Sequence, residues 1–286
     1  MSRGILQRRA APLLVVTAAL FLGAGRLLYG QGRAGQPPAG PPPAAKARAP
    51  IDLTGYWVSI ITEDWRWRMV TPPKGDYQSV PITAEAKRAA DLWNPAKDEA
   101  AGEECKSYGA AAIMRVPGRL HIVWQDDNTL KVEIDAGLQT RLLRFGPSKA
   151  PREKPTWQGD SVAEWEIPGG PGGRGGSSGE AVAGTAAAAG VGRAAGQAQP
   201  KFGHLKVVTT NMRPGYLRKN GVPYSENAVL TEYWDLYRER NGDQWLVITT
   251  LVDDPKYLQQ QYVTSPNFKK EPDGSKWDPT PCSARW

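Results

Sequence analysis

Short runs in which apolar and polar residues alternate recur along the chain, and they constrain its fold more strongly than any other feature. In residues 130–135, Leu130, Val132 and Ile134 would lie on one face of a strand and the charged residues on the other. Similar runs, separated by turn residues, occupy residues 55–61, 120–124, 139–145, 161–167, 205–210, 229–238 and 245–252. The pattern predicts a mainly β protein, an antiparallel up-and-down barrel or a closely related sandwich.

Two Asn-Gly pairs indicate turns, and one segment favours a helix. Asn241-Gly242 is typical of a two-residue β-hairpin, and Asn220-Gly221 marks another turn or loop. Residues 83–93 predict one short helix with Thr83 as its N-cap.

The first 50 residues are expected to lie outside the fold. Residues 1–25 read as an export signal, with arginines ahead of an apolar run at residues 12–22. That run is shorter than the roughly 20 residues of a membrane-spanning helix, so we expect no membrane span in the mature chain. Residues 26–50 predict a Pro/Ala-rich disordered spacer. The expected location is periplasmic or secreted; an uncleaved anchor is the alternative.

A second biased segment, residues 168–200, is dominated by glycine and alanine and contains no aromatic residue. We expect a disordered loop inserted into a single barrel domain of residues 51–286, because both flanks look like strands. A linker between two domains is the alternative.

The positive charge belongs to the leader and spacer. The chain carries 36 Lys and Arg against 29 Asp and Glu, a net charge of +7. Residues 1–50 contain seven of the basic residues and no acidic one, so residues 51–286 hold 29 of each sign. A nucleic-acid-binding domain needs a basic excess of its own, and this class is excluded.

The only two cysteines, Cys105 and Cys282, predict a disulfide in an exported chain. Such a bridge contributes roughly 2–4 kcal/mol to stability. Two separate buried thiols are the alternative.

Several motifs resemble known proteins. DLTGYW at residues 52–57 resembles the Gly-x-Trp start of lipocalin-like, or calycin, barrels, in which the Trp closes one end. With TWQGDSVAEWE (156–166), LKVVTT (205–210), LTEYW (230–234) and VDDPKY (252–257), the chain resembles a broad family of secreted bacterial proteins of undetermined role. The resemblance implies a secreted barrel and no settled activity. Residues 168–200 depart from the compact pattern of that family.

The motif Trp65-Arg66-Trp67-Arg68 is interpreted as a strand, with both indoles on one face and both guanidinium groups on the other. The indoles are either core residues or line the open end of the barrel. There they would stack on a flat or apolar ligand, with Arg reaching a carboxylate or phenolate. The other candidate ligand-binding residues are Trp124, Trp165, Arg213, Tyr216 and Tyr233, in a chain whose 11 Trp exceed the needs of packing.

Three residues are candidates for acid–base catalysis. His121 could act as a base if a carboxylate such as Glu133 or Glu164 oriented it. Arg141 would stabilise an oxyanion, and inside the fold it would need Glu164 or Glu232 as a partner. A purely structural role for each is the alternative.

No metal or cofactor is expected, because the chain has no HxH, HxxxH or CxxC spacing and no phosphate-binding glycine motif outside the biased segment. The sequence favours an exported protein that binds an aromatic or amphipathic small molecule. The alternatives are a cofactor-independent hydratase, isomerase or lyase on the same barrel, and a structural or assembly subunit at the cell surface. The oligomeric state is left open.

Overall fold

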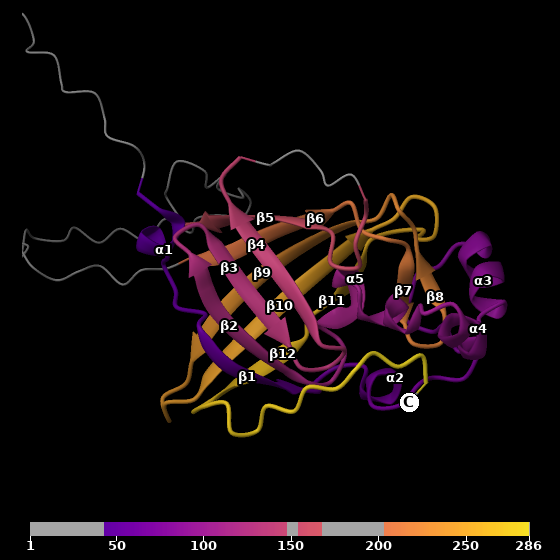
Figure 1. Cartoon of the computed structure of the whole chain (residues 1–286), viewed down its shortest axis with the longest axis horizontal. Helices are drawn as coiled ribbons and strands as arrows, with labels where there is room; N and C mark the ends of the chain where they lie inside the picture. Colours follow the sequence, from indigo (N-terminus) through magenta and orange to yellow (C-terminus); the bar gives the residue numbers. More distant parts are fainter. Residues whose placement is uncertain (1–42, 148–153, 168–202, 286) are drawn as a thin grey trace, which may run out of the picture. The chain divides into compact units, whose positions relative to one another are not determined.

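The computed structural model describes residues 43–147, 154–167 and 203–285, and within them nine strands close into a barrel (Figure 1). The neighbour order is β10-β12-β1-β2-β3-β4-β5-β6-β9, and β9 pairs back to β10. The strands are β1 Gly55–Ile60, β2 Arg119–Asp126, β3 Thr129–Ile134, β4 Gln139–Phe145, β5 Asp160–Glu166, β6 His204–Thr210, β9 Val229–Arg238, β10 Gln244–Asp253 and β12 Asn267–Glu271. The predicted barrel is confirmed, and all eight expected runs are strands of its wall.

One pairing departs from the expected antiparallel meander. Strands β4 and β5 are parallel, with Leu143 opposite Ser161. Parallel neighbours need a crossover, and residues 146–159 provide the length for the chain to return before β5 begins. The expected leader (1–25), most of the spacer and the insertion (168–200) lie outside the described residues.

The remaining elements are short. Strand β11 Tyr262–Thr264 pairs with β10, and β7 Gly215–Arg218 forms a separate hairpin with β8 Val222–Tyr224. The helices are α1 Ala45–Arg48, α2 Trp65–Arg68, α3 Ala84–Asp91, α4 Pro95–Ala100, the 3-10 helix η1 Glu104–Tyr108 and α5 Ala110–Ile113. The predicted helix is α3, and the Thr83 hydroxyl accepts a hydrogen bond from the Ala86 amide at 3.1 Å. The others have four to six residues, too few to show a helical period.

The spacer prediction was wrong for its last residues. Ala45 of α1 is fully buried, and its amide donates to Asn128 Oδ1 at 2.9 Å. Residues from 43 onward therefore belong to the folded part.

The middle of the barrel is a packed core. Along β3 the inward residues Leu130, Val132 and Ile134 are at most 3% exposed, and Trp57 is fully buried. They form one cluster with the inward residues of the other strands, which include Leu120, Ile122, Leu143, Ala163, Leu205, Val207, Trp234, Leu246, Ile248 and Phe268. The barrel interior is thus filled by the protein's own side chains, which does not fit the expectation that indoles line an open ligand site in the barrel.

A buried ion pair crosses this core. Arg141 on β4 donates from Nη1 and Nη2 to the two carboxylate oxygens of Glu232 on β9, at 2.9 and 2.6 Å. Both side chains are fully buried, and Arg141 Nη2 also lies 3.3 Å from the hydroxyl of Thr209. The expectation that Arg141 pairs with Glu164 or Glu232 is met by Glu232.

A second core lies where the short elements meet one end of the barrel (Figure 1). The disulfide Cys105–Cys282 ties η1 to the C-terminal segment, as predicted. The Asn220-Gly221 turn joins β7 to β8, and Gly221 has φ +84°. A Cβ on Gly221 would lie 2.3 Å from Cβ of Trp93, so only glycine fits there. No helix among the described residues is both long and apolar enough to cross a membrane.

The buried pair gives a stability prediction. Arg141→Met leaves the Glu232 carboxylate buried without a partner, so we expect the free energy of unfolding to fall by about 3–5 kcal/mol. The double variant Arg141→Met/Glu232→Leu removes both charges and should lose clearly less. Urea unfolding followed by tryptophan fluorescence measures both. A double variant as unstable as the sum of the two single variants would contradict this account.

Candidate functional site

A small cavity lies among α2, α5 and β7, outside the barrel. Its volume is about 30 Å³, room for two or so water molecules. Four basic side chains line it, Arg68, Arg115, Arg218 and Lys219, together with the indole of Trp67 and apolar residues such as Val70 and Leu217. No acidic side chain is among its described lining residues. The cavity therefore combines positive charge with an aromatic wall.

Arg218, the last residue of β7, is the most unusual of these groups. Its side chain is buried, at 4% exposure, and none of Nε, Nη1 and Nη2 has a hydrogen-bond partner in the described part of the chain. Its Cζ lies 4.9 Å from the ring centroid of Trp67. Such a cation–π contact is worth about 2 kcal/mol when desolvated, less than the several kcal/mol that burying an unpaired charge costs. Burying the Arg218 guanidinium therefore costs more free energy than its contact with Trp67 returns.

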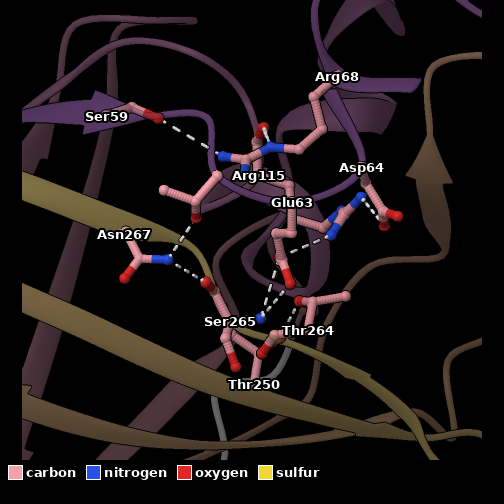
Figure 2. Close-up of polar contacts among 10 residues, drawn as sticks. Ser59, Glu63, Asp64, Arg68, Arg115, Thr250, Thr264, Ser265 and Asn267 are labelled. Atoms are coloured by element: carbon pink, nitrogen blue, oxygen red, sulfur yellow. Dashed lines mark hydrogen bonds and ion pairs between the residues drawn. The ribbon is translucent and has the colours of Figure 1, made fainter. Parts of the chain in front are cut away.

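Arg68 and Arg115 extend the cationic surface toward the barrel wall (Figure 2). Arg115 Nη1 donates to Glu63 at 3.2 Å and Nη2 to Asp64 at 2.8 Å, so its charge is compensated. Arg68 donates from Nε to the carbonyl of Arg115 at 2.9 Å and from Nη2 to the hydroxyl of Ser59 at 3.4 Å. Burial, followed by the charge of Arg115, lowers the pKa of Arg68 to about 10. Arg68 is still a cation at neutral pH.

Lys219 follows Arg218 and contacts Tyr108. Its Nζ donates to the Tyr108 hydroxyl at 2.7 Å and lies 4.3 Å from the centre of that ring. Burial lowers the pKa of Lys219 to about 6. The amine is therefore mainly neutral at pH 7 and becomes a cation in mild acid.

The orphaned polar atoms of the cavity are all nitrogens that donate. Within the described residues, five buried side-chain nitrogens of its lining have no partner: Trp67 Nε1, Arg68 Nη1, and Nε, Nη1 and Nη2 of Arg218. Buried donors without acceptors are rare in proteins, and each costs about 1–3 kcal/mol. The arrangement is complementary to a group that only accepts hydrogen bonds and carries negative charge.

The motif Trp65-Arg66-Trp67-Arg68 is helix α2, so its interpretation as a strand was wrong. In a helix the four side chains point in different directions, and only Trp67 and Arg68 line the cavity. Trp65 is 69% exposed, and Arg66 pairs with Asp76 at 2.8 Å. The bond from Arg68 Nε to the Arg115 carbonyl, made far along the chain, holds the helix in place.

Trp124 and Trp165 lie at the other end of the barrel, away from the cavity. Each contacts Phe145, with ring centroids 5.6 and 5.3 Å apart, and all three pack against the main core. Trp165 Nε1 donates to the carbonyl of Ala45 in α1 at 3.0 Å. These indoles thus serve as a platform for the segment that contains α1.

The other expected ligand-binding residues also lie apart from the cavity. Arg213 pairs with Glu103, and its Cζ lies 4.2 Å from the ring centroid of Trp157. Tyr216 donates to Asp98 at 2.9 Å, and Tyr233 contacts the edge of His204 on the outer face of the barrel. The structure gives these side chains partners within the fold.

The three expected catalytic residues are not brought together. His121 points outward from β2 and stacks on Tyr56, with ring centroids 4.1 Å apart; its Nδ1 lies 2.8 Å from Glu133, one of the two partners that the sequence indicated. Glu164 also points outward, is 61% exposed and pairs with Lys206. Arg141 points into the barrel. The barrel wall separates Arg141 from the other two.

Sequence reasoning missed Arg115, Arg218 and Lys219. A basic pair ahead of an Asn-Gly turn is normally solvated, so nothing in the sequence marked Arg218 as buried. The comparisons supply no guide either: no model of a protein family, no curated protein and no solved structure matches the chain. The geometry of the cavity carries the functional argument.

The lowered pKa of Lys219 predicts a pH effect. Between about pH 6 and the ordinary value of 10.5, the unfolded chain binds a proton that the folded protein does not. Raising the pH through this window therefore raises the free energy of unfolding. We expect wild type to gain stability relative to Lys219→Met between pH 6 and 9 in urea unfolding. Lys74→Met, at an exposed lysine, is the matched control; a pH-independent difference for Lys219→Met would contradict the assignment.

Proposed function

We propose that the protein binds a small molecule in the cavity among α2, α5 and β7, with the barrel as its support. The observation that carries this proposal is the buried guanidinium of Arg218, which has no partner within the described chain. A bound molecule with hydrogen-bond acceptors would satisfy Arg218 and the neighbouring donors of Trp67 and Arg68 together. The indole of Trp67 adds an aromatic wall to the cavity, in keeping with an amphipathic ligand.

The framework around the cavity supports a binding role because it fixes the cationic groups. Glu63 accepts from Arg115 and also from the backbone amide of Ser265, at 3.0 and 3.1 Å (Figure 2). Ser265 lies between β11 and β12, so the chain of contacts runs from the barrel strands to Arg115 and then to Arg68. Groups held in this way lose little freedom when a ligand binds.

An extracytoplasmic location fits this role. Residues 1–25 have the composition of an export signal, and the disulfide Cys105–Cys282 is typical of oxidising compartments. The Gly-x-Trp start and the closed barrel are compatible with a calycin-like fold. In this proposal the ligand lies beside the barrel, whereas a hollow barrel would hold it inside.

The proposal is tested by ligand capture. Purified wild-type protein is incubated with a metabolite extract, separated from free compounds and examined by native mass spectrometry. We expect wild type and Arg88→Met to retain the same compound and Arg218→Met to lose it. Arg88 is the matched control, because it is exposed on α3 and lies outside the cavity. Retention of nothing, or equal retention by all three proteins, would contradict the proposed site.

A further inference from the structure

We propose that the ligand of this cavity is a small monocarboxylate whose two oxygens lie against the edge of the Arg218 guanidinium. This inference rests on the proposed binding function and gives its ligand a chemical class. Three properties of the cavity support it: its charge, the geometry of its donors and its size.

The positive charge of the cavity favours the binding of an anion. Of the arginines that line it, Arg115 is compensated by Glu63 and Asp64. Arg68 and Arg218 form no ion pair within the described residues, although both are only 4% exposed. Glu63 and Asp64 also stabilise the charge of Arg68 through space, so a neutral ligand would leave the charge of Arg218 uncompensated within the described residues. A single negative charge placed beside Arg218 lowers that cost directly.

The geometry of the donors favours a carboxylate. The Cζ of Arg218 lies over the Trp67 ring, and Nε, Nη1 and Nη2 have no hydrogen-bond partner among the described residues, so the edge that carries them is available to a ligand. Two parallel N–H groups on this edge match the two oxygens of a carboxylate in a bidentate pair. Trp67 Nε1 and Arg68 Nη1 can donate to the remaining lone pairs. A halide ion is a single acceptor atom, so it does not match the two parallel N–H groups.

The size of the cavity limits the anion. The cavity of about 30 Å³ has room for the planar carboxylate group, and the rest of the ligand must then extend along the cavity walls. Apart from the basic residues, Trp67 and Ser107, these walls are apolar, with Val70, Val116, Pro117 and Leu217 among them. These walls suit a short hydrocarbon body, as in acetate or propionate, in place of a second charged group.

The test is calorimetric titration of exhaustively dialysed full-length protein, in a buffer without carboxylates, with acetate and propionate. Acetamide and propionamide are the neutral matched ligands, and chloride, phosphate and sulfate are the competing anions. We expect the carboxylates to bind at least tenfold more tightly than the amides. Loss of a charged hydrogen-bond partner typically weakens binding about 10- to 100-fold, so Arg218→Met should lose that much affinity.

Arg218→Lys keeps the charge and removes the bidentate edge. We expect it to weaken acetate binding at least tenfold while Arg88→Met stays within twofold of wild type. Circular dichroism checks that each variant folds, and Arg218→Lys decides the test if Arg218→Met does not fold. Acetate binding that Arg218→Lys leaves unchanged would overturn the bidentate assignment.

The outcomes separate this inference from the proposed function. If extract capture yields an Arg218-dependent neutral compound and no carboxylate binds, the carboxylate assignment is wrong and the binding function stands. Phosphate, sulfate or chloride binding more tightly than acetate overturns the assignment in favour of another anion. If neither carboxylates nor extract compounds bind, both proposals are overturned.

Discussion

Charge compensation inside a low-dielectric fold is the constraint on which this structure depends. Four of the described arginines are buried, and two of them have opposite kinds of surroundings. Arg141 meets Glu232 across the barrel core in a complete bidentate pair. The guanidinium of Arg218 lies over the ring of Trp67, and none of its N–H groups has a hydrogen-bond acceptor among the described residues. Because an unpaired buried charge is so unfavourable, we assign the first arrangement to the scaffold and propose that a ligand completes the second.

The barrel forms the packed support, and the short elements at its end surround the cavity. The barrel interior is filled by apolar side chains and the Arg141–Glu232 pair, which leaves it rigid and without room for a ligand. The short helices and the β7–β8 hairpin meet at one end of the barrel, where the Cys105–Cys282 disulfide ties η1 to the C-terminal segment. Contacts from Ser265 through Glu63 to Arg115 connect the cavity to the barrel strands.

The sequence predicted the parts of this fold that depend on local alternation. All eight runs became barrel strands, Thr83 caps its helix, and the two cysteines are joined. It failed where distant contacts override the local pattern. Trp65-Arg66-Trp67-Arg68 alternates like a strand, yet these residues form helix α2. The side chain of Arg68 is held there by its hydrogen bond to the distant Arg115 carbonyl. Arg218 looked like a solvated turn residue, because its burial arises only when β7 packs beside α2.

The central claim, that Arg218 is an uncompensated charge kept for a ligand, is tested most directly without any ligand. The measurement is the free energy of unfolding of exhaustively dialysed wild type and Arg218→Met in urea. A charge without a partner opposes folding, so the account predicts that the variant is more stable than wild type by about 1–4 kcal/mol. A variant less stable by several kcal/mol would show that Arg218 is already satisfied within the fold, and would contradict the account.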